Sequence, residues 1–333
     1  MDKEPYSIKI ALTFFVLILL ICCNKKDTTA RSRFTSSEVR PVNMDKLRRF
    51  DVQVLNFFEF FKIAEKSDSV EIIYDSIYKL HPDFWKIYIE KIMKFGEVNS
   101  KTARMNFRNM VKDPTVQIVF SRCYRHAFDS TLIYEVKEVM RKYAEYFSPA
   151  SVPVIVLTYS AFGYNIIALP AYLAISLEKY IDDKDIYDMA EINMYERVSM
   201  KREYLPYDML KGWILSDIES DTFSTLLDYM ITNGKVLYFL DQIFGMNGND
   251  HLKMGYSYEQ LQWAEANKQK IWAFFVSNDL IFSRKYEHIV KYIQPAPFTA
   301  GLPRESPGRL AVWIGWLIVR SYCKNHECSP DRL

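Results

Sequence analysis

Apolar residues recur at steps of three and four along most of the chain, the spacing that gives a helix one apolar face. This pattern predicts helices over residues 47–61, 82–95, 133–147, 223–244 and 307–322. A further helix is expected after Ser257, because Ser257 and Gln260 form a capping-box pattern, and its apolar positions continue to Phe275. The segment 307–322 is apolar nearly all round, as expected of a central buried helix.

Two short segments break the helical spacing. Residues 152–159 are rich in β-branched side chains, and residues 164–175 are similarly apolar and follow a turn at Phe162 and Gly163. They predict a hairpin or small sheet. The fold class is therefore expected to be α+β and helix-dominated, with one globular domain at residues 44–325 and a short tail at residues 326–333.

The chain opens with an apolar run at residues 10–23, which follows two lysines and ends abruptly at the polar Asn24. A bilayer-spanning helix needs about twenty apolar residues, so this run of fourteen has the length of a signal-peptide core instead. Its end resembles a bacterial lipoprotein box, in which a small residue precedes a lipidated cysteine. Cys23 fits this pattern better than Cys22, because small Cys22 precedes the former and bulky Ile21 the latter.

We therefore predict a signal peptide at residues 1–22 and a lipid anchor, with fatty acids such as palmitate, on Cys23. An uncleaved membrane anchor is the alternative. Lipid chains hold a protein to a membrane surface without any membrane-spanning segment. Residues 23–43 are polar and rich in Ser, Thr and Arg, which predicts a flexible tether between the lipid and the folded domain.

Composition excludes two classes of protein. With 49% hydrophobic residues, the chain has enough apolar material for a large core, which excludes intrinsic disorder of the whole. Lys and Arg number 43 against 41 Asp and Glu, a net charge of +2, and no basic stripe accompanies this balance. A nucleic-acid partner is therefore not expected.

Sequence motifs give no support for catalysis. No H-E-x-x-H, G-x-S-x-G, P-loop or G-x-G-x-x-G pattern occurs, so we predict no catalytic residue, no cofactor and no metal site. No two histidines stand four residues apart; they are His81, His126, His251, His288 and His326.

Four side chains of the segment 307–322 are expected on one helical face, because their spacing is i, i+4, i+7 and i+11: Arg309, Trp313, Trp316 and Arg320. Unpaired burial of a guanidinium group is costly, so each Arg should meet a carboxylate or an aromatic ring. One interpretation is an internal lattice of ion pairs, and the other is a ligand or partner pocket lined by Arg and Trp. We favour the lattice, and its candidate acids are Asp228, Asp241 and Glu305.

Three cysteines remain in the body of the chain, Cys123, Cys323 and Cys328. Three is an odd number and does not make a complete disulfide framework. Cys323, His326 and Cys328 lie close together, but a fourth metal ligand is missing. A strained Cys323–Cys328 bridge, or no bridge at all, is therefore favoured over a metal site.

Several motifs of the body point to one family. The most specific is the segment 306–322, which reads SPGRLAVWIGWLIVRSY, and further motifs lie at residues 49–51, 81–88, 152–153, 233–238, 255–257 and 296–299. Together they resemble the gliding-motility lipoprotein GldB family of Bacteroidota, over about residues 43–322. The resemblance implies an envelope lipoprotein that is needed for gliding and is connected with the type IX secretion and motility apparatus.

The same family is similar, distantly, to zincin-like proteases, which implies a zincin-like scaffold with a small sheet. In this chain residues 230–238 would take the place of the zinc-binding helix. They offer Asn233, Lys235 and Tyr238 but no His pair, so the metal-binding motif is absent. Lys235 and Tyr238 therefore join the four side chains of the segment 307–322 as candidate pocket or structural residues.

These features lead to two hypotheses. The first is a non-catalytic scaffold or interaction protein of the cell envelope, tied to the membrane by its lipid and bound to protein partners of the gliding and secretion machinery. Lys25 and Lys26 stand where the resemblance would place an acidic cluster for surface display, which favours the periplasm-facing leaflet. The alternative is a zinc-independent hydrolase or peptide-binding protein that uses the cleft of the protease-like scaffold.

Overall fold

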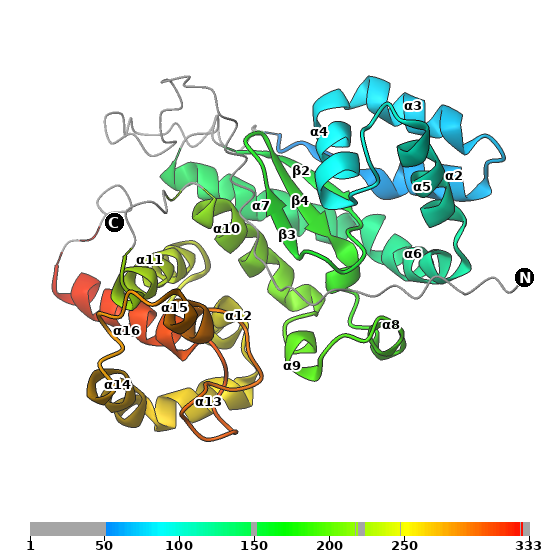
Figure 1. The fold of residues 1–333 in the computed structure, drawn as a ribbon. Coiled ribbons are helices and arrows are strands. Elements are labelled where there is room, and N and C mark those ends of the chain that lie inside the picture. Colours follow the sequence, from blue (N-terminus) through cyan, green and yellow to red (C-terminus); the bar gives the residue numbers. More distant parts are fainter. Residues whose placement is uncertain are drawn as a thin grey trace, which may run out of the picture.

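The computed structural model describes residues 51–147, 152–216, 218, 224–246, 248–326 and 328. The predicted signal peptide, Cys23 and the predicted tether lie outside the described residues. In Figure 1 the first helices gather at one end of the molecule, the last helices at the other, and a small sheet lies between them. The expectation of a helix-dominated α+β fold is confirmed.

The sheet has four strands in the order β1-β2-β4-β3. They are β1 (Val54–Asn56), β2 (Val154–Thr158), β3 (Ile166–Ala168) and β4 (Tyr172–Ser176). The first three in this order are parallel, with Val54 opposite Ile155 and Thr158 opposite Ser176, whereas β3 is antiparallel to β4. The predicted small sheet is confirmed, but residues 152–159 and 164–175 do not form a hairpin with each other, because β2 and β4 run parallel and the second segment divides into β3 and β4.

Strand β1 corrects the prediction of one helix over residues 47–61. Helix α2 (Phe57–Lys66) begins only after Asn56, whose side chain accepts a hydrogen bond from the Phe58 amide (3.2 Å). The Asn56 side-chain Nδ2 also donates to the Ala127 carbonyl (2.8 Å), which fixes the strand-to-helix junction. Val54 is thereby placed in the sheet, although its spacing also fits a helix.

Helices of the first half share an aromatic core. The rings of Phe61 and Phe120 stack with their centroids 5.2 Å apart, and those of Trp85 and Tyr88 stack at the same distance. The helix predicted over 82–95 is divided and ends in a π-helical turn at Ile92. The elements are α3 (Val70–Leu80), α4 (Pro82–Ile87), the π-helix η1 (Tyr88–Ile92), α5 (Lys101–Lys112), α6 (Pro114–Ala127) and α7 (Ser130–Tyr146).

Glu178, directly after β4, is fully buried beside the turn that follows β2. Its Oε1 accepts hydrogen bonds from the Ser160 amide (2.8 Å), the Ser160 hydroxyl (2.9 Å) and the Phe162 amide (3.1 Å). Ala161 and Phe162 have φ of 53° and 60°, uncommon for residues other than glycine, so these bonds stabilise a strained turn. Burial raises the pKa of Glu178, although its hydrogen bonds from Ser160 and Phe162 act in the opposite direction.

Short elements lead from the sheet to the second half of the molecule. They are η3 (Leu177–Lys179), α8 (Lys184–Met189), α9 (Met194–Arg197), η4 (Arg202–Tyr204) and α10 (Leu205–Leu215). Helix α10 contacts β3, β4, α7 and α11, and so joins the sheet to the C-terminal helices.

The C-terminal helices form the other end of the molecule (Figure 1). They are α11 (Leu226–Phe244), α12 (Asp250–Met254), α13 (Tyr258–Ala266), α14 (Lys268–Ser277), α15 (Tyr286–Ile293) and α16 (Leu310–Asn325). The Ser257–Gln260 capping box is confirmed, but the helix that it opens breaks at Asn267 into α13 and α14. In the part of the chain that the structure describes, no helix has the length and apolar character needed to cross a membrane.

Candidate functional site

Helices α11 and α16 pack along each other and bring Asp241 to the centre of a buried charge cluster. Asp241 Oδ1 accepts from Lys253 Nζ (2.7 Å) and Arg320 Nη2 (2.6 Å), and Oδ2 accepts from Arg320 Nε (2.7 Å) and Trp316 Nε1 (2.9 Å). The side chains of Asp241 and Lys253 have no exposed surface. The predicted pairing of Arg320 with Asp241 is confirmed.

Asp250, at the start of α12, completes this cluster. Arg320 Nη1 donates to Asp250 Oδ2 (2.6 Å), and Lys253 Nζ lies 3.2 Å from Asp250 Oδ1. Burial alone would raise the pKa of Asp250, but its hydrogen bond to Arg320 and the nearby cations lower it. The Arg320 guanidinium also stacks on Trp316, 3.8 Å from the ring centroid. Two cations and two carboxylates therefore balance each other, which is the internal lattice expected from the sequence.

The other two predicted acids do not join the lattice. Asp228 belongs to the capping box that opens α11, where its carboxylate accepts a hydrogen bond from the Thr225 amide (2.8 Å). Glu305 is exposed in the loop before α16. Both predictions are wrong for the same reason: these carboxylates lie near the ends of their segments, away from the buried part of α16.

The prediction that Arg309 lies on the face of the helix and pairs with an acid is wrong. Arg309 lies outside the helix and pairs with no acid among the described residues. It occupies the N-cap of α16 with φ 61° and ψ 23°, in the left-handed region. This turn directs its side chain to α12, where Nη1 donates to the Met254 carbonyl (2.9 Å). The helix accordingly begins at Leu310 and not at residue 307.

The remaining sequence candidates do not form a common pocket. Trp313 and Tyr238 are buried, and Lys235 is half-buried on α11. Within the described part of the chain, no hydrogen bond or ion pair links Lys235 or Tyr238 to Arg309, Trp316 or Arg320. The six candidates are thus divided among the lattice, the N-terminal end of α16 and the body of α11.

Two surface grooves lie elsewhere. A groove of about 740 Å³ runs along α7, η4 and α10, where Arg202 pairs with Asp129 (2.6 Å) and Glu135 (3.1 Å). Burial lowers the pKa of His126 in this groove, and the charge of Arg202 adds to the effect. A second groove of about 480 Å³ lies between α14 and α16, with exposed Trp272 and Tyr322 at its edge. Neither groove is lined by any of the six sequence candidates.

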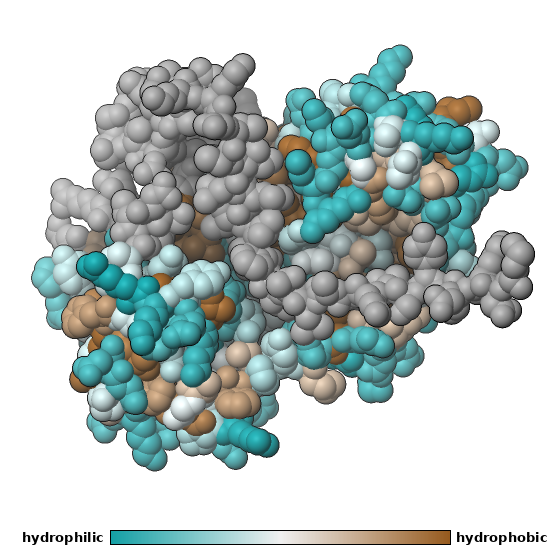
Figure 2. All heavy atoms as spheres, viewed as in Figure 1, coloured by the Kyte–Doolittle hydropathy of each residue, from teal (hydrophilic) through white to brown (hydrophobic). Residues whose placement is uncertain are grey.

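Figure 2 shows apolar surface scattered over the C-terminal helices at the lower left. The exposed apolar side chains of these helices and of the loop before α15 are Tyr258, Trp272, Val276, Phe282, Tyr286, Val290 and Tyr322. Apolar side chains scattered singly over a surface are normal, so they do not by themselves mark a binding site.

Sequence reasoning missed Lys253 and Asp250. Their i, i+3 spacing is a signal, because it places an acid and a lysine on the same face of a helix. Most such pairs lie on the surface, and the sequence around α12 does not show that this helix is covered. Lys211 and Asp208, an ion pair at the same spacing on α10 (2.7 Å), were missed for the same reason.

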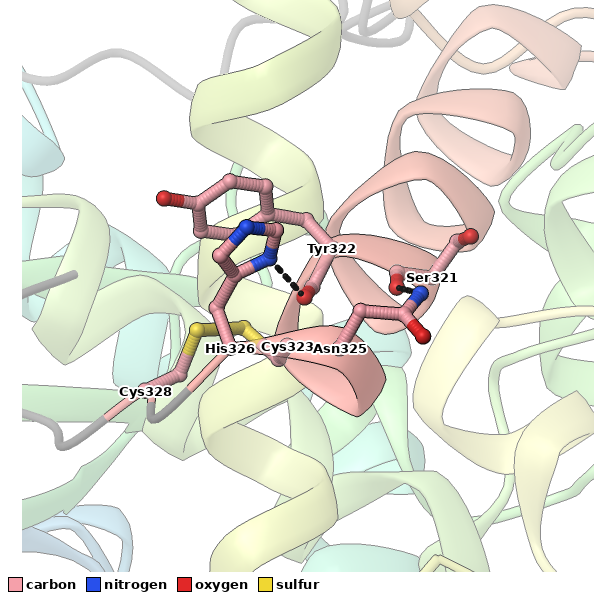
Figure 3. The surroundings of a disulfide bond; sticks show 6 residues. All are labelled: Ser321, Tyr322, Cys323, Asn325, His326 and Cys328. Atoms are coloured by element: carbon pink, nitrogen blue, oxygen red, sulfur yellow. Dashed lines mark hydrogen bonds between the residues drawn. A yellow bond between two sulfur atoms is a disulfide. The ribbon is translucent and has the colours of Figure 1, made fainter.

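The C-terminal cysteines are bonded to each other, as Figure 3 shows. The His326 ring stacks on Tyr322 with centroids 4.3 Å apart, and His326 Nδ1 lies 3.0 Å from the Tyr322 carbonyl oxygen. Of the two possibilities left open by the sequence, the structure therefore has the Cys323–Cys328 bridge. Across the described ranges, no group of three or more His, Cys, Asp or Glu residues is placed to hold a metal ion.

Comparison with known proteins identifies the family. No curated protein and no solved structure matches the chain significantly, so similarity to a zincin-like protease stays a prediction. The family model described as gliding motility protein GldB matches residues 37–333. This match covers most of the chain, including the lattice and the C-terminal bridge, and the chain therefore belongs to the GldB family of gliding motility proteins.

Proposed function

We propose that the protein is a lipid-anchored, non-catalytic scaffold or interaction protein of the cell envelope that acts with the gliding and type IX secretion apparatus. Membership of the family implies involvement in gliding motility, and the family's designation suggests a lipoprotein of the envelope. The apolar run ending at Cys23 supports an anchor on the membrane, and Lys25 and Lys26 favour its periplasm-facing leaflet. The partners are envelope proteins of the same machinery.

The observation that carries the non-catalytic part of this proposal is the closed charge lattice of Asp241, Lys253, Asp250 and Arg320. A general acid or base needs a proton or lone pair within reach of a substrate. Here the four charged groups are hydrogen-bonded to one another, and two of them have no exposed surface. They stabilise the α11–α16 pair, and none of these four groups is free for chemistry.

The segment that would replace a zinc-binding helix supports the same proposal. It lies in the middle of α11, where Asn233, Lys235 and Tyr238 would take the place of a His pair. A cation such as Lys235 disfavours a bound Zn²⁺, and zinc sites need three or four His, Cys or carboxylate ligands. In the alternative, a zinc-independent hydrolase or peptide-binding protein, the 740 Å³ groove along α7 and α10 is the place for a peptide.

The anchor and motility parts are tested in cells. The gene is replaced by the wild type, by Cys23→Ala and, as a matched control, by Cys22→Ala. We expect Cys23→Ala alone to leave the membrane fraction, to lose labelled fatty acid, and to reduce colony spreading and type IX secretion. A Cys23→Ala strain that retains labelled, membrane-bound protein contradicts the anchor.

The non-catalytic part is tested with the purified chain. We expect no cleavage when it is incubated with a peptide library that is analysed by mass spectrometry, and no stoichiometric zinc in metal analysis. Cleavage by the wild type that Lys235→Ala or Tyr238→Phe abolishes without unfolding would favour the hydrolase. Affinity capture of the lipidated chain from its own envelope, followed by mass spectrometry, then identifies the partner.

A further inference from the structure

The two ends of α16 differ in their charge balance. At the C-terminal end Lys253 and Arg320 face two carboxylates. At the N-terminal end Arg309 and Lys211 have one carboxylate between them, Asp208, which lies 2.7 Å from Lys211 Nζ. No other carboxylate of the described residues lies within ion-pair distance of Arg309 or Lys211. This end of the helix therefore carries one uncompensated positive charge.

The two cations come together beside Gly255, in the turn between α12 and α13. Gly255 has φ 76°, and a β-carbon built on it would lie 3.3 Å from Arg309 Nη1 and 3.9 Å from Lys211 Nζ. The third neighbour of this point is Ser199 Cβ, also at 3.9 Å. Arg309, Lys211 and Ser199, from three separate segments, thus lie close around the side of Gly255 that carries no side chain, and a β-carbon there would already touch Arg309.

Both cations have hydrogen-bond donors to spare. A guanidinium carries five N–H donors in a planar fork, and among the described residues the hydrogen bond that Arg309 makes is the one to the Met254 carbonyl. Arg309 is half-buried and the Lys211 side chain is 11% exposed, so part of each residue is reached by solvent. Burial lowers the pKa of Lys211, Asp208 raises it, and the charge of Arg309 lowers it again, as expected where two cations share one acid.

The backbone holds Arg309 in an unfavourable position. Its left-handed conformation is uncommon for a residue with a β-carbon, and such strain concentrates at functional sites. Gly308 is packed so closely that a β-carbon on it would lie 2.6 Å from the Ala296 carbonyl oxygen, and its own carbonyl accepts a hydrogen bond from Tyr256. Arg309 also stands at the N-terminus of α16, where the helix dipole is positive and opposes a cation.

We propose that the recess formed by Arg309, Lys211 and Ser199 at Gly255 binds a single carboxylate group of a partner polypeptide, either a side chain or a chain terminus. One carboxylate carries the one negative charge that is missing, and its two oxygens match the fork of Arg309. A phosphate dianion would bring excess negative charge towards Asp208. The assignment rests on the proposed function, since it makes the ligand part of a protein partner.

The first test uses the full chain, purified in detergent, and acetylated tri-alanine with a free C-terminal carboxylate. The matched ligand is the same peptide as its C-terminal amide, and inorganic phosphate is the third arm. We expect the acid to bind at least about ten-fold more tightly than the amide, because only the acid makes charge-assisted hydrogen bonds. Arg309→Met and Lys211→Met should remove this difference, and Lys235→Met, a half-buried lysine of α11, should keep it.

Equal binding of acid and amide would overturn the proposal, and so would tighter binding of phosphate than of the peptide acid. The membrane-anchorage and colony-spreading assays do not use this peptide, so their results for the wild type do not depend on whether the peptide binds. Failure of this inference is therefore distinguishable from failure of the proposed function.

A second pair of variants does not depend on removing a buried cation. Ser199→Asp supplies a carboxylate from within the protein, and Ser199→Asn is its neutral, equally sized control. We expect Ser199→Asp to melt at a higher temperature than Ser199→Asn and to bind acid and amide equally. A lower melting temperature for Ser199→Asp would show that the recess has no surplus positive charge and would overturn the proposal.

Discussion

Gly234 of α11 and Gly315 of α16 meet where the two helices cross. A β-carbon on Gly234 would lie 2.4 Å from the Gly315 carbonyl oxygen, and one on Gly315 would lie 1.9 Å from the Met230 carbonyl oxygen. The two backbones are therefore in direct contact, and no larger residue fits at either position. This close approach places Asp241 of α11 within hydrogen-bond distance of Trp316 and Arg320 on α16.

Gly315→Ala should destabilise the protein. In an exposed helix, replacing glycine by alanine stabilises by about 1 kcal/mol. Here the new methyl group meets backbone atoms that cannot rotate away, so we expect a net loss of about 1–3 kcal/mol. Thermal unfolding measures the change, with Ser321→Ala on the exposed face of the same helix as control. A melting temperature equal to that of the wild type would contradict the backbone contact.

Asp241→Asn should have a larger effect. The change leaves Lys253 and Arg320 with Asp250 as their carboxylate, and breaking a buried ion pair on one side costs about 3–5 kcal/mol. Denaturant unfolding measures the free energy of unfolding. Glu305→Gln, which neutralises an exposed carboxylate, is the control and should remain within about 0.5 kcal/mol of the wild type. Equal effects of the two variants would mean that the lattice does not stabilise the fold.

Much of the helical part of the fold could be predicted from the spacing of apolar residues. Helix α7 and the body of α11 lie close to their predicted positions, and the capping box at Ser257 marks the start of α13. The start of α2 could not be predicted in this way. Val54 fits both a helix and a strand, and the choice depends on Asn56 and on pairing with β2, about a hundred residues further along the chain.

The candidate site was predicted in part. Arg320 and Asp241 both interrupt long apolar helices, so the need for a partner is visible in the sequence. The pairing of Lys253 with Asp241 and of Asp250 with Arg320 could not be predicted from the sequence. Helix α12 is short, and its burial depends on how it packs against α11. Arg309 was placed on the helix because no glycine or asparagine signals a left-handed residue at that position.

Glu178 should make stability depend on pH. Because burial raises its pKa in the folded protein above the ordinary value of 4.5, its contribution is fully present below that value. The contribution is lost as pH rises through the raised folded pKa. We therefore expect Glu178→Gln to gain stability relative to the wild type as pH rises above 4.5. The amide keeps an acceptor for Ser160 and Phe162, so the turn is preserved.

The measurement is the difference in free energy of unfolding between the wild type and Glu178→Gln at several pH values. This difference cancels the titration of carboxylates elsewhere, such as Asp250. The groups whose charges interact with Glu178 are Lys179, Cys123, Tyr88 and Tyr159. A difference that is constant with pH would mean that the folded and unfolded states bind the Glu178 proton equally.

The last prediction concerns the thiols of the mature chain. If lipidated Cys23 is the first residue, Cys22 is removed and the Cys23 sulfur is blocked, while Cys323 and Cys328 are bonded to each other. Cys123 then remains as the free thiol. It is fully buried, and burial raises the pKa of its thiol well above the usual range, so little reactive thiolate forms.

We expect almost no reaction of the native protein with a thiol reagent, one equivalent after unfolding, and three after unfolding with a reductant. Cys123→Ala should lose the single equivalent and keep the two that need reduction. Three equivalents without a reductant would contradict the C-terminal bridge, and fast reaction of the native protein would contradict the burial of Cys123.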